Sequence, residues 1–227
     1  MQEHRSEETY RGAEWSSSSV LPLWLFQRDT QERPISEAEQ AWARRLPESR
    51  SRQFRQSRGS VRSALAEFWN LNALEVPLHA PPGKPPTLAS GWGCVSFSHC
   101  RDALLVGWSP QRLGVDIERA DRSIPADQLS RRFFCSQDRQ VIVNLEEEEM
   151  RAAVLNQWLI KEAAIKWQRG SIAADLIHWQ CDLQASVTFH RCHGYRLRVQ
   201  GLCHGPWTMA LAVDVAGMQQ APMVCLV

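Results

Sequence analysis

The chain has 227 residues, of which 44% are hydrophobic and 22% charged, and its formal net charge is +1. This composition is typical of a globular protein and excludes a disordered or fibrous chain. Because the net charge is close to zero, we expect no general attraction to nucleic acid or to an anionic membrane. Binding of an anion would therefore depend on local clusters of positive charge.

The seven cysteines form no C-x-x-C pair, so they indicate reduced thiols rather than a zinc site or a disulfide framework. The first residues include acids and lack an apolar core, unlike a signal peptide. The apolar run at 21–26 is too short to cross a bilayer. We therefore expect a cytoplasmic protein without a membrane partner.

In chain order, residues 1–19 are polar and are predicted to form a flexible tail, followed by a strand at 21–29. A helix is predicted from Ser36, because Glu37 and Glu39 would lie at the positive end of its dipole. A proline-rich loop is predicted next, at 77–91, followed by two strands at 95–99 and 103–108.

Arginine is concentrated between Arg44 and Arg62, where seven arginines accompany a single acid, Glu48. Arg55, Arg58 and Arg62 have the spacing of residues that share one helix face. An apolar stripe continues behind them, so the segment predicts a helix with a locally basic face.

The second half opens with a strand predicted at 113–119. Helices are predicted at 123–134 and from about Gln137, the latter continuing from Glu149 to about Gly170, a candidate left-handed C-cap. The last strands are predicted at 186–192, 195–202 and 207–215. The order strand, helices, strands thus occurs twice, at 20–112 and 113–227. We predict an α+β fold of two similar halves, related by a pseudo-twofold and packed into one compact monomer.

Asp116 and Glu118 lie two residues apart on a predicted strand, so both carboxylates leave the same face. Two like charges at this separation repel each other unless a cation lies between them. Magnesium is suited to such a site, because it binds carboxylates, waters and substrate phosphates. The alternative is an edge strand that exposes two acids to solvent.

A predicted helix carries Trp158, Glu162 and Lys166 at intervals of four residues, along one face. Glu162 and Lys166 have the spacing of a surface ion pair, which is the simpler interpretation. Trp158 argues against it, because a large aromatic side chain normally faces a core or a cleft. At the rim of a cleft, a glutamate could hold a metal and a lysine a phosphate.

Two smaller motifs contain groups suited to phosphate binding. Ser98 and His99 end a predicted strand, where a hydroxyl, an imidazole and turn amides could face a phosphate. Lys84 is fixed between a glycine and a proline. The simpler alternatives are a hydrogen-bonded structural histidine and a solvated loop lysine.

The motifs occur in the order G-K-P, S-H, G-V-D-I-E and W-x-x-K-E-A-x-x-K. In this order and spacing, from about Arg50 to Lys166, they resemble the Sfp-type 4'-phosphopantetheinyl transferase family. The resemblance implies that family's fold and a holo-acyl-carrier-protein synthase activity. Such an enzyme uses Mg²⁺ to move phosphopantetheine from coenzyme A to a serine of an apo acyl or peptidyl carrier protein, releasing 3',5'-ADP.

The resemblance also implies roles for individual residues. The implied metal ligands are Asp116, Glu118 and Glu162. Glu162 is also the implied base for the carrier serine, and Lys166 the implied contact to the pyrophosphate, with Lys161 as its partner in the motif. The residues implied to hold coenzyme A phosphates are Lys84, Ser98 and His99, with Arg62, Arg50 and Arg52 at the 3'-phosphate.

Two other functions would account for part of the sequence pattern. A nucleic-acid-binding module would use the arginines, but three carboxylates without a metal would repel a phosphate backbone, so no nucleic-acid partner is expected. A magnesium-dependent hydrolase of a nucleotide pyrophosphate would share the metal site and differ only in using water as acceptor. We expect a monomer, because one chain contains both halves, unlike the small trimeric holo-carrier synthases.

Overall fold

The computed structural model describes residues 20–27, 31–215 and 221–227, so the tail predicted at 1–19 lies outside the described residues. The chain forms two compact units. Of the described residues, the first unit contains 20–27, 31–97, 102–110 and 221–227, and the second unit contains 98–101 and 111–215. None of the helices in the described ranges has the length and apolar character needed to cross a bilayer.

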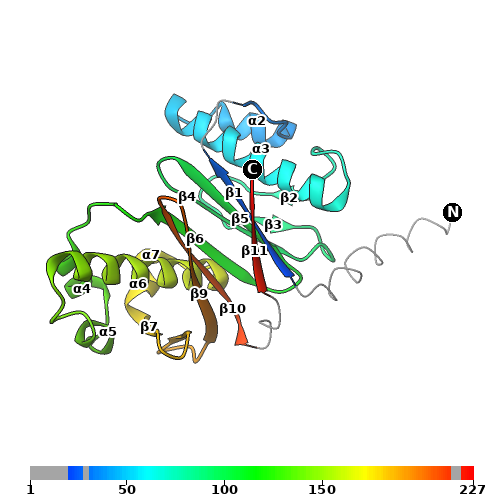
Figure 1. Cartoon of the computed structure of the whole chain (residues 1–227). Coiled ribbons are helices and arrows are strands. Elements are labelled where there is room, and N and C mark those ends of the chain that lie inside the picture. The colour runs from blue at the N-terminus through cyan, green and yellow to red at the C-terminus, as the bar shows by residue number, and fades with distance from the viewer. Residues whose placement is uncertain (1–19, 28–30, 216–220) are drawn as a thin grey trace. The chain divides into compact units, whose positions relative to one another are not determined.

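The first unit is built on a four-stranded sheet in the order β11-β1-β5-β4 (Figure 1). Its strands are β1 (Val20–Gln27), β4 (Cys94–His99), β5 (Ala103–Ser109) and β11 (Ala221–Leu226). Strand β1 is antiparallel to β5 and parallel to β11. The strands predicted at 95–99 and 103–108 are thereby confirmed, as is the strand predicted at 21–29 up to Gln27, since residues 28–29 lie outside the described residues. Strand β11 was not predicted. It pairs with β1 of the first unit, whereas the predicted boundary assigned its residues to the second half.

Helices α2 (Glu37–Ala43) and α3 (Glu48–Trp69) belong to the same unit. The predicted helix start is confirmed, since Ser36 caps α2 in a capping box with Glu39. Helix α3 buries Val61 and Leu65 in a core that also contains residues of β1 and β5. The predicted loop at 77–91 contains a short antiparallel pair, β2 (Leu78–His79) and β3 (Thr87–Leu88).

The second unit contains a five-stranded antiparallel sheet in the order β6-β10-β9-β8-β7. Its strands are β6 (Leu113–Arg119), β7 (Trp179–Asp182), β8 (Val187–His190), β9 (Arg196–His204) and β10 (Trp207–Asp214). Its helices are α4 (Ala126–Phe133), α5 (Ser136–Gln140), α6 (Glu147–Gln168) and α7 (Ile172–Asp175), followed by the 3₁₀ turn η1 (Leu176–His178). Both units therefore have a mixed α+β architecture, and their pseudo-twofold relation stays a prediction.

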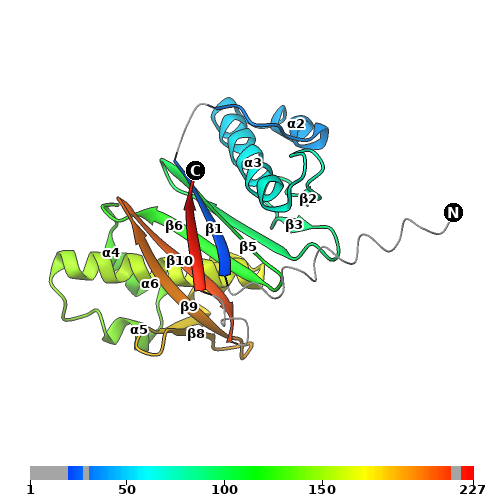
Figure 2. The ribbon, with the colours of Figure 1, turned by 45° about the vertical axis from the view of Figure 1, so that its right-hand side comes forward.

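Helix α6 packs along the five-stranded sheet and supplies much of the second unit's core (Figure 2). The helix predicted to run on from Gln137 is instead divided into α5 and α6. The predicted cap at Gly170 is wrong, because Arg169 takes the left-handed conformation, with φ of 62°. A Cβ on Gly170 would lie 2.4 Å from Asp175 Oδ2, so that side chain would have to shift to accept a larger residue.

Helix α6 approaches the sheet closely at Gly114 of β6. A Cβ built on Gly114 would lie 1.8 Å from the carbonyl oxygen of Ala163 and 2.7 Å from the backbone nitrogen of Trp167. Both contacts are with helix backbone, which cannot rotate away as a side chain can. The absence of a side chain at position 114 therefore lets α6 lie directly against β6.

We predict that Gly114→Ala destabilises the protein, because the added methyl group forces β6 and α6 apart. The free energy of unfolding should fall by about 1–3 kcal/mol or more, as for overpacked cores, when measured by urea denaturation. Gly201→Ala in β9 is the matched control, since a Cβ there meets only Asn156 Oδ1 at 3.6 Å. Equal losses in the two variants would contradict the close approach.

Candidate active site

Strand β6 and helix α6 bring together charged residues of two sequence motifs. Asp116 and Glu118 lie on the same face of β6 as Gly114, and this face meets α6 at Ala163. Glu162 and Lys166 belong to that part of α6. Asp116 is 3% exposed, which excludes for this residue the alternative of a solvated acid on an edge strand.

Asp116 is held by two donors. Lys166 Nζ donates to Asp116 Oδ1 at 2.6 Å, and the Ser98 hydroxyl donates to the same oxygen at 2.5 Å. Lys166 also donates to the carbonyl oxygen of Val115 at 3.1 Å. The lysine is thus joined to the strand and not to Glu162, so the interpretation of a surface Glu162–Lys166 ion pair is not supported.

Glu162 lies in an environment that disfavours its charge. Burial raises the pKa of its carboxyl group from the usual 4.5 to about 7, and the negative charge of Asp116 adds to the effect. Lys166 lowers the pKa, as does the Trp158 indole N–H, which donates to Glu162 Oε1 at 2.5 Å. The spacing of Trp158 indicated a cleft, but its role as a hydrogen-bond donor to Glu162 was not predicted.

Glu118 is the most accessible of the three acids, with a side chain 22% exposed. Burial raises the pKa of its carboxyl group, and Asp116 contributes in the same direction. The guanidinium of Arg122, four residues later, forms an ion pair with Glu118 and opposes this shift. Sequence reasoning missed Arg122, because Glu118 lies on a strand and Arg122 follows the turn after it, so no helical spacing relates the two residues.

Taken together, Asp116, Glu118 and Glu162 offer carboxylate oxygens to one region, and each affects the ionisation of another. Hard oxygen donors of this kind suit Mg²⁺, which also keeps waters and accepts substrate phosphates as ligands. A divalent cation would relieve the repulsion that raises the pKa of Glu162. The residues present therefore fit a magnesium site.

A second group of possible metal ligands, Asp175, His190 and His193, has its donor atoms within 4.8 Å of one another. The backbone N–H groups of Cys192 and His193 both donate to His190 Nδ1, at 3.2 and 3.1 Å. Neutral His190 therefore carries its proton on Nε2, which faces Asp175 Oδ1 at 3.6 Å. This hydrogen-bonding pattern does not leave Nε2 as a metal ligand.

The residues implied to bind coenzyme A phosphates have different environments. Ser98 is buried, and its hydroxyl is used by Asp116, so in this structure it positions a carboxylate. His99 is exposed at the end of β4. Lys84 is exposed in a turn of the first unit, after Gly83 with φ of 71°.

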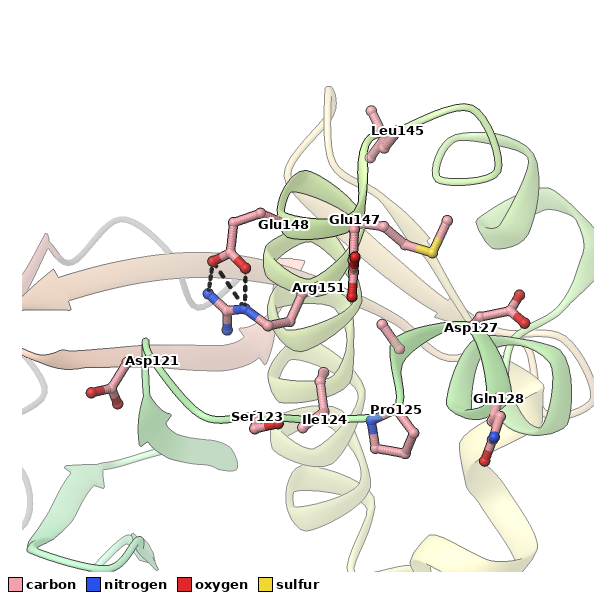
Figure 3. A pocket seen from close by; sticks show the side chains of 12 residues that line it. Asp121, Ser123, Ile124, Pro125, Asp127, Gln128, Leu145, Glu147, Glu148 and Arg151 are labelled. Atoms are coloured by element: carbon pink, nitrogen blue, oxygen red, sulfur yellow. Dashed lines mark hydrogen bonds and ion pairs between the residues drawn. The ribbon is translucent and has the colours of Figure 1, made fainter.

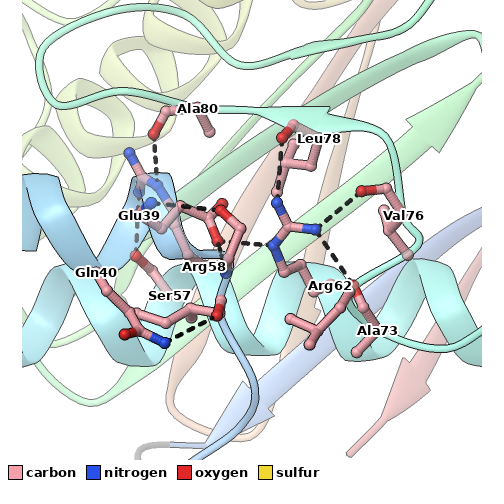
Figure 4. A network of polar contacts seen from close by, with 12 residues as sticks. Glu39, Gln40, Ser57, Arg58, Arg62, Ala73, Val76, Leu78 and Ala80 are labelled. Atoms are coloured by element: carbon pink, nitrogen blue, oxygen red, sulfur yellow. Dashed lines mark hydrogen bonds and ion pairs between the residues drawn. The ribbon is translucent and has the colours of Figure 1, made fainter.

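Arg62 is buried in the first unit, where it does not meet the expectation of a phosphate-binding residue. Its Nε donates to Glu39 Oε2 at 2.7 Å (Figure 4). Its Nη atoms donate to three carbonyl oxygens, those of Ala73, Val76 and Leu78. Because the guanidinium is 3% exposed and hydrogen-bonded on every side, the structure assigns Arg62 to the fold of the first unit.

Lys161 likewise does not face the site, because its side chain and that of Asp138 are both fully buried. Its ammonium donates to Asp138 Oδ2 and to the carbonyl oxygen of Trp179, and lies 4.7 Å from the centre of the Phe134 ring. The pair connects α6 to α5 and β7. Lys161 therefore has a structural role in the second unit, and its implied part in binding coenzyme A stays a prediction.

Arg50 and Arg52 are exposed on the first turns of α3, and Arg52 pairs with Glu48 at 3.2 Å. Arg52 also lines a cavity of about 660 Å³ in the first unit. The arginines that line this cavity are Arg33, Arg44, Arg52 and Arg55. Arg33 lies outside the arginine-rich segment, so the sequence did not point to it.

A cavity of about 860 Å³ lies in the second unit, between the segment that follows β6 and the start of α6 (Figure 3). Its apolar lining includes Ile124, Leu145 and Met150, and its rim includes Glu147 and Glu148. Two of the four consecutive glutamates at 146–149 therefore border a cavity at the N-terminus of α6.

Comparison with known families gives one match. Residues 112–212 match the family model of the 4'-phosphopantetheinyl transferase superfamily. The matched range contains all four charged residues of the β6–α6 site and most of the second unit. A search of curated proteins finds no match to the chain.

We predict that Glu162 gives the metal-free protein a distinctive pH dependence. Its pKa is about 7 in the folded state and near 4.5 in the unfolded state. Between these values the folded state binds more protons, so the free energy of unfolding falls as the pH rises from 4.5 to 7. Relative to Glu162→Gln, wild type should lose roughly 1–3 kcal/mol over this range.

The measurement is urea denaturation in EDTA at several pH values, comparing the two proteins so that all other titrating groups cancel. Parallel curves for wild type and Glu162→Gln would contradict the raised pKa.

Proposed function

We propose that the protein is a 4'-phosphopantetheinyl transferase that modifies a serine of apo acyl or peptidyl carrier proteins, with coenzyme A as donor. The observation that carries this proposal is the convergence of Asp116, Glu118, Glu162 and Lys166, within the segment that matches the superfamily. The carboxylates suit a metal that binds a pyrophosphate, and the lysine suits the pyrophosphate itself.

In the proposed reaction, the carrier serine oxygen forms a bond to the β-phosphorus of coenzyme A. The bond from that phosphorus to the bridging oxygen breaks, and 3',5'-ADP leaves with the bond's electron pair. Glu162 accepts the serine proton, directly or through a water.

Magnesium, when bound to Asp116, Glu118 and Glu162, would neutralise charge on the pyrophosphate. Lys166 adds a second positive charge from α6 and is held in place by Val115 and Asp116. Ser98 fixes the orientation of Asp116, and Trp158 that of Glu162. The chain's own contribution is therefore mainly placement and charge stabilisation, as expected for phosphoryl-type transfer.

We further propose that Lys84, His99 and the arginines at the start of α3 hold the phosphates of coenzyme A. The four arginines that line the cavity bring several positive charges to one space. A dianionic phosphate is bound better by such a group of guanidinium groups than by a single exposed arginine. Arg62 and Lys161 are left out of this set, because their donors are satisfied by buried partners.

The direct test is incubation with coenzyme A, Mg²⁺ and a panel of apo carriers, followed by mass measurement of the carriers. We predict that wild type adds phosphopantetheine to at least one carrier and that Asp116→Ala does not. Glu162→Gln should still bind coenzyme A but transfer roughly 10²–10⁴ times more slowly, as for loss of a general base.

Cleavage of coenzyme A without a change in carrier mass would instead indicate a pyrophosphate hydrolase. Full activity of Glu162→Gln would show that a group other than Glu162 accepts the proton of the carrier serine.

A second prediction distinguishes the arginines that line the cavity from Arg50, which does not line it. If the cavity receives the 3'-phosphate, Arg55→Gln should raise the KM for coenzyme A more than tenfold, as for a charged hydrogen bond worth about 1.5–3 kcal/mol. It should affect dephospho-coenzyme A little, because that molecule lacks the 3'-phosphate. The opposite pattern, with Arg50→Gln sensitive and Arg55→Gln not, would place the phosphate on the exposed face of α3.

A further inference from the structure

Arg122 lies beside the proposed metal ligands without belonging to any motif. It follows β6 and forms an ion pair with Glu118, with Nη1 donating to Oε1. Among the described residues, Glu118 is the one ion-pair partner of Arg122. The pair therefore provides Glu118 with a positive charge in the absence of any metal.

The backbone that carries Arg122 is fixed independently of this pair. Arg151 of α6 donates through Nη1 to the carbonyl oxygens of Ala120, at 2.8 Å, and of Arg122, at 3.1 Å. Arg151 is itself oriented by Glu148, whose Oε1 lies 2.5 Å from Nη2 (Figure 3). The side chain of Arg122 can thus change position while its backbone stays in place.

The two cations at the site differ in how firmly they are held. Lys166 donates to Asp116 and to the carbonyl oxygen of Val115, and its side chain is 30% exposed. Arg122 contacts the site only through Glu118, and its side chain is 47% exposed. Of the two cations, Arg122 is therefore the one that can leave for solvent without losing a second buried bond.

A metal ion at the same carboxylate would compete with Arg122. Three carboxylates and two side-chain cations leave one net negative charge at the site. Adding Mg²⁺ with both cations retained would reverse that sign and place like charges close together, which is unfavourable. The guanidinium and the metal would also both require oxygens of Glu118.

We propose that Arg122 is a built-in counter-ion, which occupies Glu118 in the metal-free protein and leaves it when the divalent cation binds. It thereby lowers the affinity of the site for Mg²⁺ by the free energy needed to break the pair. This inference rests on the proposed function only in taking Asp116, Glu118 and Glu162 as the magnesium ligands. A partly exposed ion pair of this kind corresponds to a factor of about 1.5 to 5 in the dissociation constant.

The test is the binding of Mg²⁺ to the full chain without coenzyme A, measured by calorimetry and by the rise of Tm over a Mg²⁺ titration. Arg122→Gln removes the charge but keeps a polar side chain. Arg131→Gln is the matched control, because Arg131 forms an i,i+4 pair with Asp127, at 2.8 Å, that involves no proposed metal ligand. Asp116→Ala reports binding outside the site.

We expect Arg122→Gln to bind Mg²⁺ about 1.5- to fivefold more tightly than wild type, with Arg131→Gln unchanged. Suppose that wild type binds Mg²⁺ and Asp116→Ala does not. If Arg122→Gln then binds Mg²⁺ as tightly as wild type or more weakly, the proposed role of Arg122 as a counter-ion is wrong, while the magnesium site remains supported. If neither wild type nor Arg122→Gln binds Mg²⁺ more tightly than Asp116→Ala, the magnesium site of the proposed function fails, and the inference fails with it.

Discussion

The contact between helix α6 and strand β6 at Gly114 is the constraint on which the site depends. With no side chain at this position, the carbonyl oxygen of Ala163 lies where a Cβ would be. Side chains one turn apart on the helix can then reach side chains two residues apart on the strand. The glycine of the G-V-D-I-E motif thus allows α6 to pack closely against β6, and the acids of that motif provide carboxylates to the site.

The same close packing explains the electrostatics. Side chains that meet between a helix and a sheet lose water, so their charges interact more strongly than at the surface. Asp116 is compensated by Lys166 and Ser98, and Glu118 by Arg122. Glu162 is buried beside Asp116 with a neutral indole as its donor, and burial, with the charge of Asp116 adding to it, raises its pKa to about 7. In the metal-free protein, either a proton on Glu162 or an added cation can reduce the negative charge of the site.

The alternation and periodicity of apolar residues predicted β1, β4, β5, β6 and the main helices, because these depend on local pattern. The motif spacing likewise predicted that Asp116 and Lys166 belong to one site. The burial of Arg62 and Lys161 was not predicted, because charged residues are normally exposed. Their buried partners, Glu39 and Asp138, lie 23 residues away along the chain, so no local pattern reveals them. The same holds for β11, whose partner β1 lies at the other end of the sequence.

Strand β11 pairs in parallel with β1 over six residue positions, from Val20–Ala221 to Leu25–Leu226. During synthesis, β1 can pair with β5 once Ser109 has been made, but its pairing with β11 has to wait for the next 111 residues, 110–220. An unpaired strand edge invites association with other chains. Contacts of such long sequence separation also form slowly. The sheet of the first unit is therefore completed only when β11 pairs with β1, after the strands of the second unit have been made.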